Sequence, residues 1–171
     1  MRNGRIIASI LRFALPAGVC GLLCAADVKP VSPPGAHVVG PYTPGLLAGR
    51  FLYVSGQGAL DAAGAFPKTT AEQVRQTLDN VRTIVEAAGL TMDHLVYAQL
   101  YVTDAASYGD ALAAWRGYFK DGAPALAVLG VATLPAGTPV EITAVAVTDL
   151  GLRRVIRLPG GAAGASPDAV V

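Results

Sequence analysis

The chain has 171 residues, of which 53% are hydrophobic and 15% are charged, and its formal net charge is +1. This length suits one domain and is short for two, and so apolar a chain is expected to fold around a core rather than stay disordered. The near-neutral charge, without a basic stripe, argues against nucleic acid as the main partner.

The first 26 residues have the composition of a secretory signal peptide. An apolar run, FALPAGVCGLL, follows three arginines and is too short to cross a bilayer. It leads into Cys24-Ala25-Ala26, whose small residues suit cleavage before Asp27. We therefore expect a secreted or periplasmic protein that has no membrane segment after cleavage of the signal peptide. An uncleaved N-terminal anchor is the alternative.

Cleavage would also change the chemistry that the chain has available. It removes three of the 13 basic residues and no acidic one, which leaves 10 basic against 12 acidic residues and a net charge of −2. Both cysteines, Cys20 and Cys24, are lost as well, so the mature chain has no disulfide and no thiolate nucleophile. Its two histidines, His37 and His94, are far apart in sequence, and we expect no metal site.

The rest of the chain divides into one domain and two flanking segments. Residues 27–36 are proline-rich and indicate an extended lead-in, residues 37–150 carry the domain, and residues 151–171 form a flexible tail that ends in a Gly-, Ala- and Pro-rich stretch. The first clear strand is Arg50–Gly56, which is rich in β-branched and aromatic residues. Residues 37–42 are the candidate for its hairpin partner.

The clearest helix follows this strand. Thr69 with Glu72 and Thr70 with Gln73 both fit a capping box, which fixes the start of the helix to within one residue. Apolar residues then recur every three or four positions, at Val74, Leu78, Val81, Val85 and Ala88. Gly89 is expected to end the helix in the left-handed conformation. Since only one side is apolar, the helix should lie on a sheet.

The second half of the domain predicts one more helix and three strands. A strand is expected at 95–102, and Asp104 then caps a helix that runs to about Phe119. One side of this helix carries Tyr108, Leu112, Trp115 and Phe119. Two strands follow at 125–132 and 138–147. The order β-β-α-β-α-β-β predicts an α+β domain with two helices on one face of a mixed sheet, and the other face is expected to pack against another subunit.

Few residues in the chain can carry chemistry. No mature serine lies in a G-x-S-x-G turn, and no glycine-rich loop has the pattern of a phosphate site, which argues against a hydrolase triad and a nucleotide site. The remaining candidates are Tyr42 after a Gly-Pro turn, Ser55-Gly56-Gln57 at the end of a strand, and Glu141. Tyr42 can equally be an aromatic residue at the edge of the core, and the Ser55 hydroxyl can equally cap its strand.

Glu141 is the one carboxylate in the otherwise charge-free run 137–147. With a period of two it points away from the side of Val140 and Ile142, toward whatever covers the second face of the sheet. If that face is a subunit interface, Glu141 is a partly buried carboxylate in a crevice, where functional carboxylates are common. If the face is open to water, Glu141 is a solvated charge. We predict that it belongs to a pocket.

Together these segments resemble the reactive intermediate deaminase family (RidA/YjgF type). The motifs GPYTPG, FLYVSGQ, EQVRQTLDNVRTIVEAAGL, YFKDGAPA, TLP and VEITAVAV follow its order and spacing from Gly40 to Val147. The resemblance implies a chorismate-mutase-like fold and a homotrimer with ligand clefts between subunits. It also implies hydrolysis of enamines and imines such as 2-aminoacrylate to a keto acid and ammonia, with no metal or organic cofactor.

Carried over motif by motif, the resemblance places Tyr42, Ser55, Gly56 and Gln57 in the substrate cleft. It gives Glu141 the catalytic role, in which the carboxylate orients the attacking water and moves protons.

The chain departs from the family pattern at the position that holds the substrate carboxylate. The deaminases have Pro-Ala-Arg-Ser/Thr after the second helix, whereas this chain has Leu126 and Ala127 at the last two positions, and Leu112 stands where an asparagine is usual. A bidentate Arg–carboxylate contact supplies two charge-assisted hydrogen bonds of about 1.5–3 kcal/mol each, and leucine supplies none. A 2-imino acid should therefore bind poorly, unless Arg50 or Arg116 reaches in.

Three functions remain open at this point. The chain can be a diverged enzyme that acts on a neutral or cationic imine or enamine, with 2-imino acid deamination as a special case. It can be a binding module for a less acidic small molecule, with Glu141 paired to an amine of the ligand. It can also be a trimer whose cleft no longer has a ligand. We predict binding of a less acidic small molecule, and imine or enamine deamination is the alternative.

Overall fold

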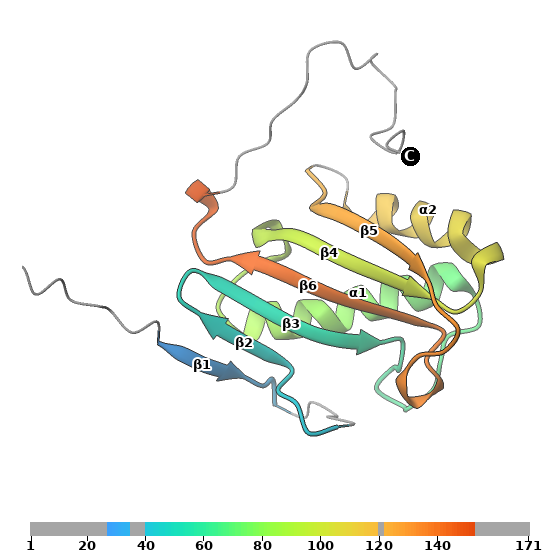
Figure 1. Ribbon diagram of the computed structural model, residues 1–171, viewed down its shortest axis with the longest axis horizontal. Coiled ribbons are helices and arrows are strands. Elements are labelled where there is room, and N and C mark those ends of the chain that lie inside the picture. The colour runs from blue at the N-terminus through green and yellow to red at the C-terminus, as the bar shows by residue number, and fades with distance from the viewer. Residues whose placement is uncertain (1–26, 35–39, 120–121, 153–171) are drawn as a thin grey trace, which may run out of the picture.

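The computed structural model describes residues 27–34, 40–119 and 122–152. Its centre is a six-stranded sheet with the strand order β1-β2-β3-β6-β4-β5 (Figure 1). The strands are β1 (Val28–Val31), β2 (Gly45–Ala48), β3 (Phe51–Gly58), β4 (Leu95–Val102), β5 (Ala125–Gly130) and β6 (Val140–Val147). The β4–β5 pair is parallel and the other pairs are antiparallel, so the sheet is mixed.

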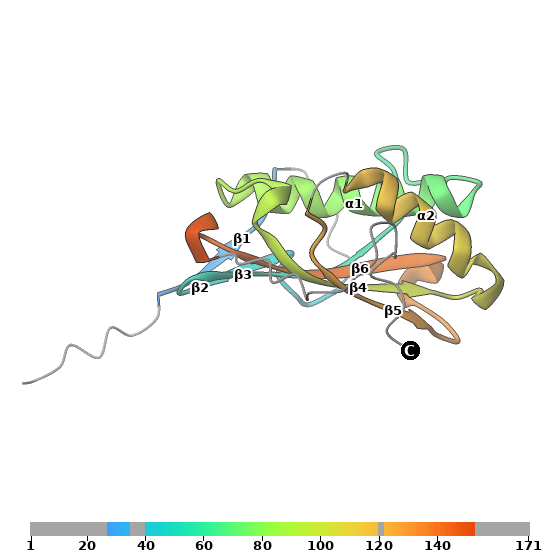
Figure 2. The same cartoon turned by 90° about the horizontal axis from the view of Figure 1, so that it is seen from above.

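Two α-helices, α1 (Thr70–Ala87) and α2 (Tyr108–Tyr118), lie on the same face of this sheet (Figure 2). Short 3₁₀ turns occupy Met92–His94, Ala105–Ser107, Pro135–Gly137 and Leu150–Leu152. The predicted α+β class, with two helices on one face of a mixed sheet, is confirmed. Across the described ranges, no helix combines the length and the apolar character that a membrane span requires.

The signal peptide predicted over residues 1–26 and most of the tail predicted over residues 151–171 lie outside the described residues. Cleavage and export therefore stay predictions. The intact mass of the chain recovered from an expressing bacterium tests them, because a processed chain should begin at Asp27.

The N-terminal part of the sheet differs from the prediction. The proline-rich lead-in contributes the edge strand β1, where Pro30 is tolerated because an edge strand needs fewer ladder hydrogen bonds. The partner strand predicted at 37–42 is wrong: β3 pairs with β2, and the described part of that segment, 40–42, forms a bend. Pro41 lacks the N–H that a ladder needs, whereas Gly49, at φ 57°, makes the tight turn from β2 to β3.

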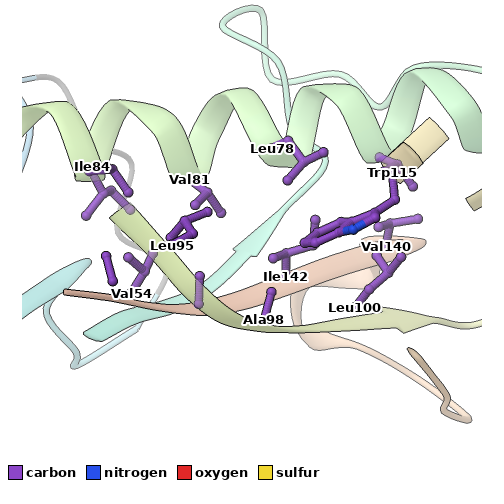
Figure 3. Packing of buried hydrophobic residues seen from close by; sticks show 14 of the residues in the cluster. Val54, Leu78, Val81, Ile84, Leu95, Ala98, Leu100, Trp115, Val140 and Ile142 are labelled. Atoms are coloured by element: carbon purple, nitrogen blue, oxygen red, sulfur yellow. The ribbon is translucent and has the colours of Figure 1, made fainter. Parts of the chain in front are cut away.

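Helix α1 starts where the capping box predicts. The Thr69 hydroxyl accepts a hydrogen bond from the Glu72 amide, and the Glu72 carboxylate accepts one from the Thr69 amide at 3.0 Å. Gly89, at φ 76°, follows the helix as expected. Most of the predicted apolar stripe is fully buried, at Val74, Leu78, Val81 and Val85. Figure 3 shows Leu78 and Val81 pointing from the helix toward the sheet.

Helix α2 buries a side that is shifted from the predicted one, since Trp115 is buried and Phe119 packs against the core as predicted. Its buried residues are Ala111, Ala114 and Trp115. Tyr108 is 49% exposed, and Leu112 is only half-buried. The small alanines let α2 lie close to its neighbours, and the Trp115 ring fills the space between the helices and the sheet beside Leu78 and Val140 (Figure 3).

No described element of the single chain covers the face of the sheet opposite the helices (Figure 2). Large apolar side chains on it are between 38% and 48% exposed, at Phe51, Tyr53, Tyr97 and Leu129. The rings of Phe51 and Tyr53 lie together, with their centroids 6.3 Å apart. A cluster of exposed aromatic side chains of this kind marks an interaction surface.

Candidate functional site

Strand β3 is longer than its neighbour β2, and this difference creates a cavity. Strand β2 pairs with 51–54 of β3, so Gly56–Gly58 extends past its end (Figure 1). The pairing of β3 with β6 also shifts register between Val54 and Gln57, which indicates a β-bulge. A cavity of about 660 Å³ opens here, between Gly56–Gly58, one side of α1, and the segments that precede β2 and β6.

Glu141 reaches this cavity from β6. Its neighbours Val140 and Ile142 are buried against the helices, and Glu141, half-buried, points to the opposite side as the period of two predicts. In the sheet it lies opposite Gly58 of β3 and Tyr101 of β4. Glu141 thus lines a cavity of the single chain, whereas the crevice between subunits that the sequence predicts for it stays a prediction.

The Glu141 carboxyl has no polar partner in the described part of the chain. Burial is the one cause that acts on it, and burial raises its pKa above the ordinary glutamate value. A half-buried carboxylate without a protein partner gains from any donor that enters the cavity, whether a proton, an N–H group or a water molecule.

Three other predicted site residues line the same cavity as Glu141. Tyr42 is 46% exposed at its mouth, and Gly56 and Gln57 form its wall. The Gln57 Nε2 donates to the carbonyls of Ser55 and Gly56, at 3.0 Å each, which assigns Oε1 as the atom left free to accept.

Ser55 does not line this cavity in the single chain. Its hydroxyl donates to the Pro44 carbonyl at 2.9 Å, and its amide donates to the same oxygen. These contacts support the alternative in which the Ser55 hydroxyl caps its strand.

Two polar side chains of the cavity wall, Asn80 and Thr138, have hydrogen-bond partners within the protein. The Asn80 amide donates to the carbonyls of Gly58 and Leu60, at 2.9 Å each, and its Oδ1 accepts from Gln76. The Thr138 hydroxyl, buried, accepts from the Ala59 amide at 2.9 Å and donates to the Val140 carbonyl at 2.8 Å. These contacts fix the loop that follows β3 to α1 and to β6.

The sequence did not single out Asn80 or Thr138. An asparagine on the flank of an amphipathic helix and a threonine before a strand are common on protein surfaces. Only the path of the loop after β3 shows that each has buried backbone partners.

The charged side chains that line the cavity leave it net negative. Three are acidic, Asp61, Asp79 and Glu141, and one is basic, Arg82. The Arg82 Nη2 already pairs with Asp79 at 2.9 Å. The Asp61 Oδ1 accepts from two loop amides, at 2.8 and 2.9 Å. Among the described residues, no three His, Cys, Asp or Glu side chains are grouped closely enough to hold a metal ion.

Leu126 and Ala127 do not meet Glu141 within one chain. They lie on β5 at the far edge of the sheet, with β4 between β5 and β6. Leu126 pairs in register with the buried Ala98 and packs against the core. A cleft that contains both Leu126 and Glu141 therefore requires a second copy of the chain, and their shared site stays a prediction.

Comparison with known proteins places this fold in one family. The chain matches the Endoribonuclease L-PSP family over residues 34–148. It belongs to this family, that of the RidA/YjgF proteins.

The chain aligns with most of the length of its curated relatives. The RutC family protein y4sK of Sinorhizobium fredii is 38% identical over 123 residues, which are 69% of this chain and 96% of the relative. The 2-iminobutanoate/2-iminopropanoate deaminase of Escherichia coli K12 is 36% identical over 113 residues, which are 64% of this chain and 88% of the relative.

Solved structures share the fold. The YjgF gene product of E. coli superposes with a TM-score of 0.63 at 35% identity, over 66% of this chain and 91% of that one. E. coli TdcF with bound serine superposes with a TM-score of 0.64 at 30% identity, over 70% of this chain and 98% of that one.

The raised pKa of Glu141 predicts how stability depends on pH. Because the folded-state pKa lies above the unfolded value of about 4.3, ionised Glu141 destabilises the fold. This penalty is absent below the unfolded pKa and develops as the pH rises through the folded pKa. Glu141→Gln should therefore raise the melting temperature at pH 7 and leave it unchanged near pH 3.

Glu72→Gln is the matched control, for which we expect the melting temperature to shift in the opposite direction at pH 7. Hydrogen bonds from Thr69 lower the pKa of Glu72, so its stabilising effect is present above the unfolded pKa and is lost as the pH falls through the folded one. Thermal denaturation from pH 3 to pH 8 should show the two variants shifting in opposite directions at pH 7. A Glu141→Gln variant that loses stability at pH 7 would show that Glu141 has a stabilising partner.

Proposed function

We propose that the chain binds a small amine or imine, neutral or cationic, in the cavity at the end of β3. The Glu141 carboxylate accepts a hydrogen bond from the N–H group of this ligand. One observation carries this proposal: on the β3 and β6 side of the cavity, the lining side chains present acceptors whose hydrogen-bonding capacity no described residue fills. They are the Glu141 carboxylate, the Gln57 Oε1 and the Tyr42 hydroxyl, and of these only the hydroxyl can also donate. A ligand that fills this capacity donates hydrogen bonds.

The charge of the cavity supports the same class of ligand. A ligand carboxylate would face three acidic side chains and one arginine that is already paired with Asp79. It would lose its hydration without an unpaired lining cation to replace the water, which is unfavourable. Leu126, in the position where the deaminases have arginine, supports the same preference if β5 of a neighbouring subunit reaches the cavity.

The family description does not make the chain a nuclease. A phosphate backbone is bound by clustered Lys and Arg side chains, and the acidic lining of this cavity opposes it. The proposed ligand is therefore a small molecule and not nucleic acid.

The proposal predicts selective stabilisation by amines. In a thermal-shift screen of amines, amidines and carboxylic acids of matched size, the nitrogen bases should raise the melting temperature and the acids should not. Glu141→Ala should weaken amine binding about ten- to a hundredfold, because a charge-assisted hydrogen bond contributes roughly 1.5–3 kcal/mol.

Glu86→Ala is the control, since Glu86 is an exposed carboxylate of α1 outside the cavity. Amine binding should be unchanged in this variant. Stabilisation by acids instead of amines, or amine binding that Glu141→Ala leaves intact, would refute the proposal.

Hydrolysis of an imine is the second candidate function. The raised pKa of Glu141 favours it, because a general base works best when its pKa approaches the working pH. Curated relatives that are 2-iminobutanoate/2-iminopropanoate deaminases also support it. The cavity holds both the carboxylate and room for a water molecule beside the ligand.

In this reaction Glu141 moves each proton. It accepts a proton from water while the water oxygen adds to the imine carbon, and it passes that proton to the nitrogen to give a carbinolamine. It then accepts the hydroxyl proton and again passes it to the nitrogen. The C–N bond breaks, the carbonyl forms and ammonia leaves. No redox change and no cofactor are needed.

Ammonia release from freshly generated imines separates the two functions. A hydrolase should release ammonia from a simple imine without a carboxylate, and Glu141→Gln should abolish this rate. On 2-aminoacrylate the wild type should be at least about a hundredfold slower than the E. coli deaminase, and Leu126→Arg should recover part of the difference. A wild-type rate on 2-aminoacrylate equal to that of the E. coli enzyme would contradict the preference for less acidic ligands.

We propose that the uncovered face of the sheet packs against further copies of the chain in a trimer. The exposed aromatic side chains of this face support it, as does the family resemblance. Such an assembly would also bring β5 of one copy beside the cavity of the next, which a single chain does not do.

Light scattering on residues 27–171 should give three times the chain mass. Tyr97→Glu should dissociate the assembly, because it puts a charge into the apolar interface. Tyr108→Glu, at a similarly exposed tyrosine on the opposite side of the domain, should leave it intact. A monomer at every concentration would exclude a cleft shared between subunits.

A further inference from the structure

Gly56 differs from the other strand glycines because the Glu141 side chain occupies the space that a side chain at this position would need. The three heavy atoms nearest to a Cβ built at this position all belong to the Glu141 side chain. The Glu141 Oε1 is the nearest of them, and Cδ and Cγ follow at 2.7 and 3.3 Å. Real Cβ atoms do not come this close to a carboxyl group, so the carboxylate lies in space that any other residue at 56 would fill.

The backbone gives no other reason for glycine at this position. Gly56 is absent from the glycines with positive φ, which are Gly49, Gly64, Gly89, Gly122 and Gly137. Alanine could therefore adopt the backbone conformation of Gly56 without strain. The next strand glycine, Gly58, differs, because a Cβ there would meet the buried Thr138 side chain, which holds the fold.

The bulge in β3 brings Gly56 beneath Glu141. In the register of residues 51–54 Glu141 would lie opposite Gln57. The bulge shifts the pairing by one residue, so that Glu141 lies opposite Gly58 and Gly56 faces the same side of the sheet as the Glu141 side chain. Gln57 holds this irregular backbone, because its Nε2 donates to the carbonyls of both Ser55 and Gly56. These carbonyls belong to the part of β3 that β2 does not cover.

We propose that Gly56 is the positioning residue for Glu141: by lacking a side chain it lets the carboxylate lie against the β3 bulge, inside the cavity, and Gln57 keeps the bulge in place. A Cβ at 56 pushes the carboxylate away from the backbone and toward solvent. This inference deepens the proposed function, and the position of Glu141 can be measured without any ligand.

The test is the titration of Glu141 by NMR of its side-chain carboxyl carbon. In the wild type the pKa of Glu141 should lie above the ordinary value, and in Gly56→Ala it should fall toward about 4.3, the value of an exposed glutamate. Gly130→Ala is the control, because a Cβ at this β5 position meets open space. The pKa of Glu141 should be unchanged in this variant.

The same variants then report on binding. Gly56→Ala should weaken amine binding about tenfold or more, whereas Gly130→Ala should not. If the pKa of Glu141 falls in Gly56→Ala but no amine binds even the wild type, the positioning role holds and the proposed function fails. If Gly56→Ala stays folded and the pKa of Glu141 does not move, the positioning role is refuted.

A double variant keeps the test decisive if Gly56→Ala is unstable. Aspartate is one methylene shorter than glutamate, so Glu141→Asp should give the alanine its space. A double-mutant cycle in thermal stability should show that Gly56→Ala costs less in the Glu141→Asp background than in the wild type. Additive effects of the two substitutions would refute the contact on which the inference rests.

Discussion

A half-buried carboxylate without a polar partner among the described residues, resting on the bare backbone of Gly56, is the interaction on which the site depends. It exists because β2 pairs with only part of β3 and because β3 bulges where that pairing ends. The uncovered end of β3 forms the cavity wall, and the bulge brings a position without a side chain under Glu141. A longer β2 or a side chain at 56 would fill this space with protein.

The surrounding contacts leave Glu141 as the one acidic lining residue without a polar partner in the described part of the chain. Asn80 donates to the carbonyls of Gly58 and Leu60, Thr138 accepts from the Ala59 amide, and Arg82 pairs with Asp79. These contacts hold the walls of the cavity still. Burial raises the pKa of Glu141, a destabilising arrangement of the kind that functional sites retain.

The sequence predicts the fold well where a single element carries its own signal. The capping box at Thr69 defines the start of α1, and the strand at 95–102 is found with the predicted bounds. The hairpin partner of β3 could not be found in this way. Strand β2 has only four residues, and its Gly45 is explained by a tertiary contact, since a Cβ there would lie 2.7 Å from Ile84. The buried side of α2 likewise depends on its packing against α1 and not on its own period.

The site is predictable only in part for the same reason. The period of two places Glu141 on the side away from the core, and the Gly-Pro turn and the strand end draw attention to Tyr42 and Gln57. The contact between Glu141 and Gly56 depends on a bulge that no periodicity reports. The position of Leu126 at the far edge of the sheet depends on strand order, which the element sequence alone leaves open.

A crystal structure with a primary amine bound, beside one soaked with an α-keto acid of similar size, tests the central claim most directly. The amine nitrogen should lie about 2.7–2.9 Å from a Glu141 oxygen, with the carboxylate still against Gly56, and the keto acid should leave the cavity empty. A keto acid clamped in that cavity by an arginine or lysine, with Glu141 turned away from it, would contradict the account.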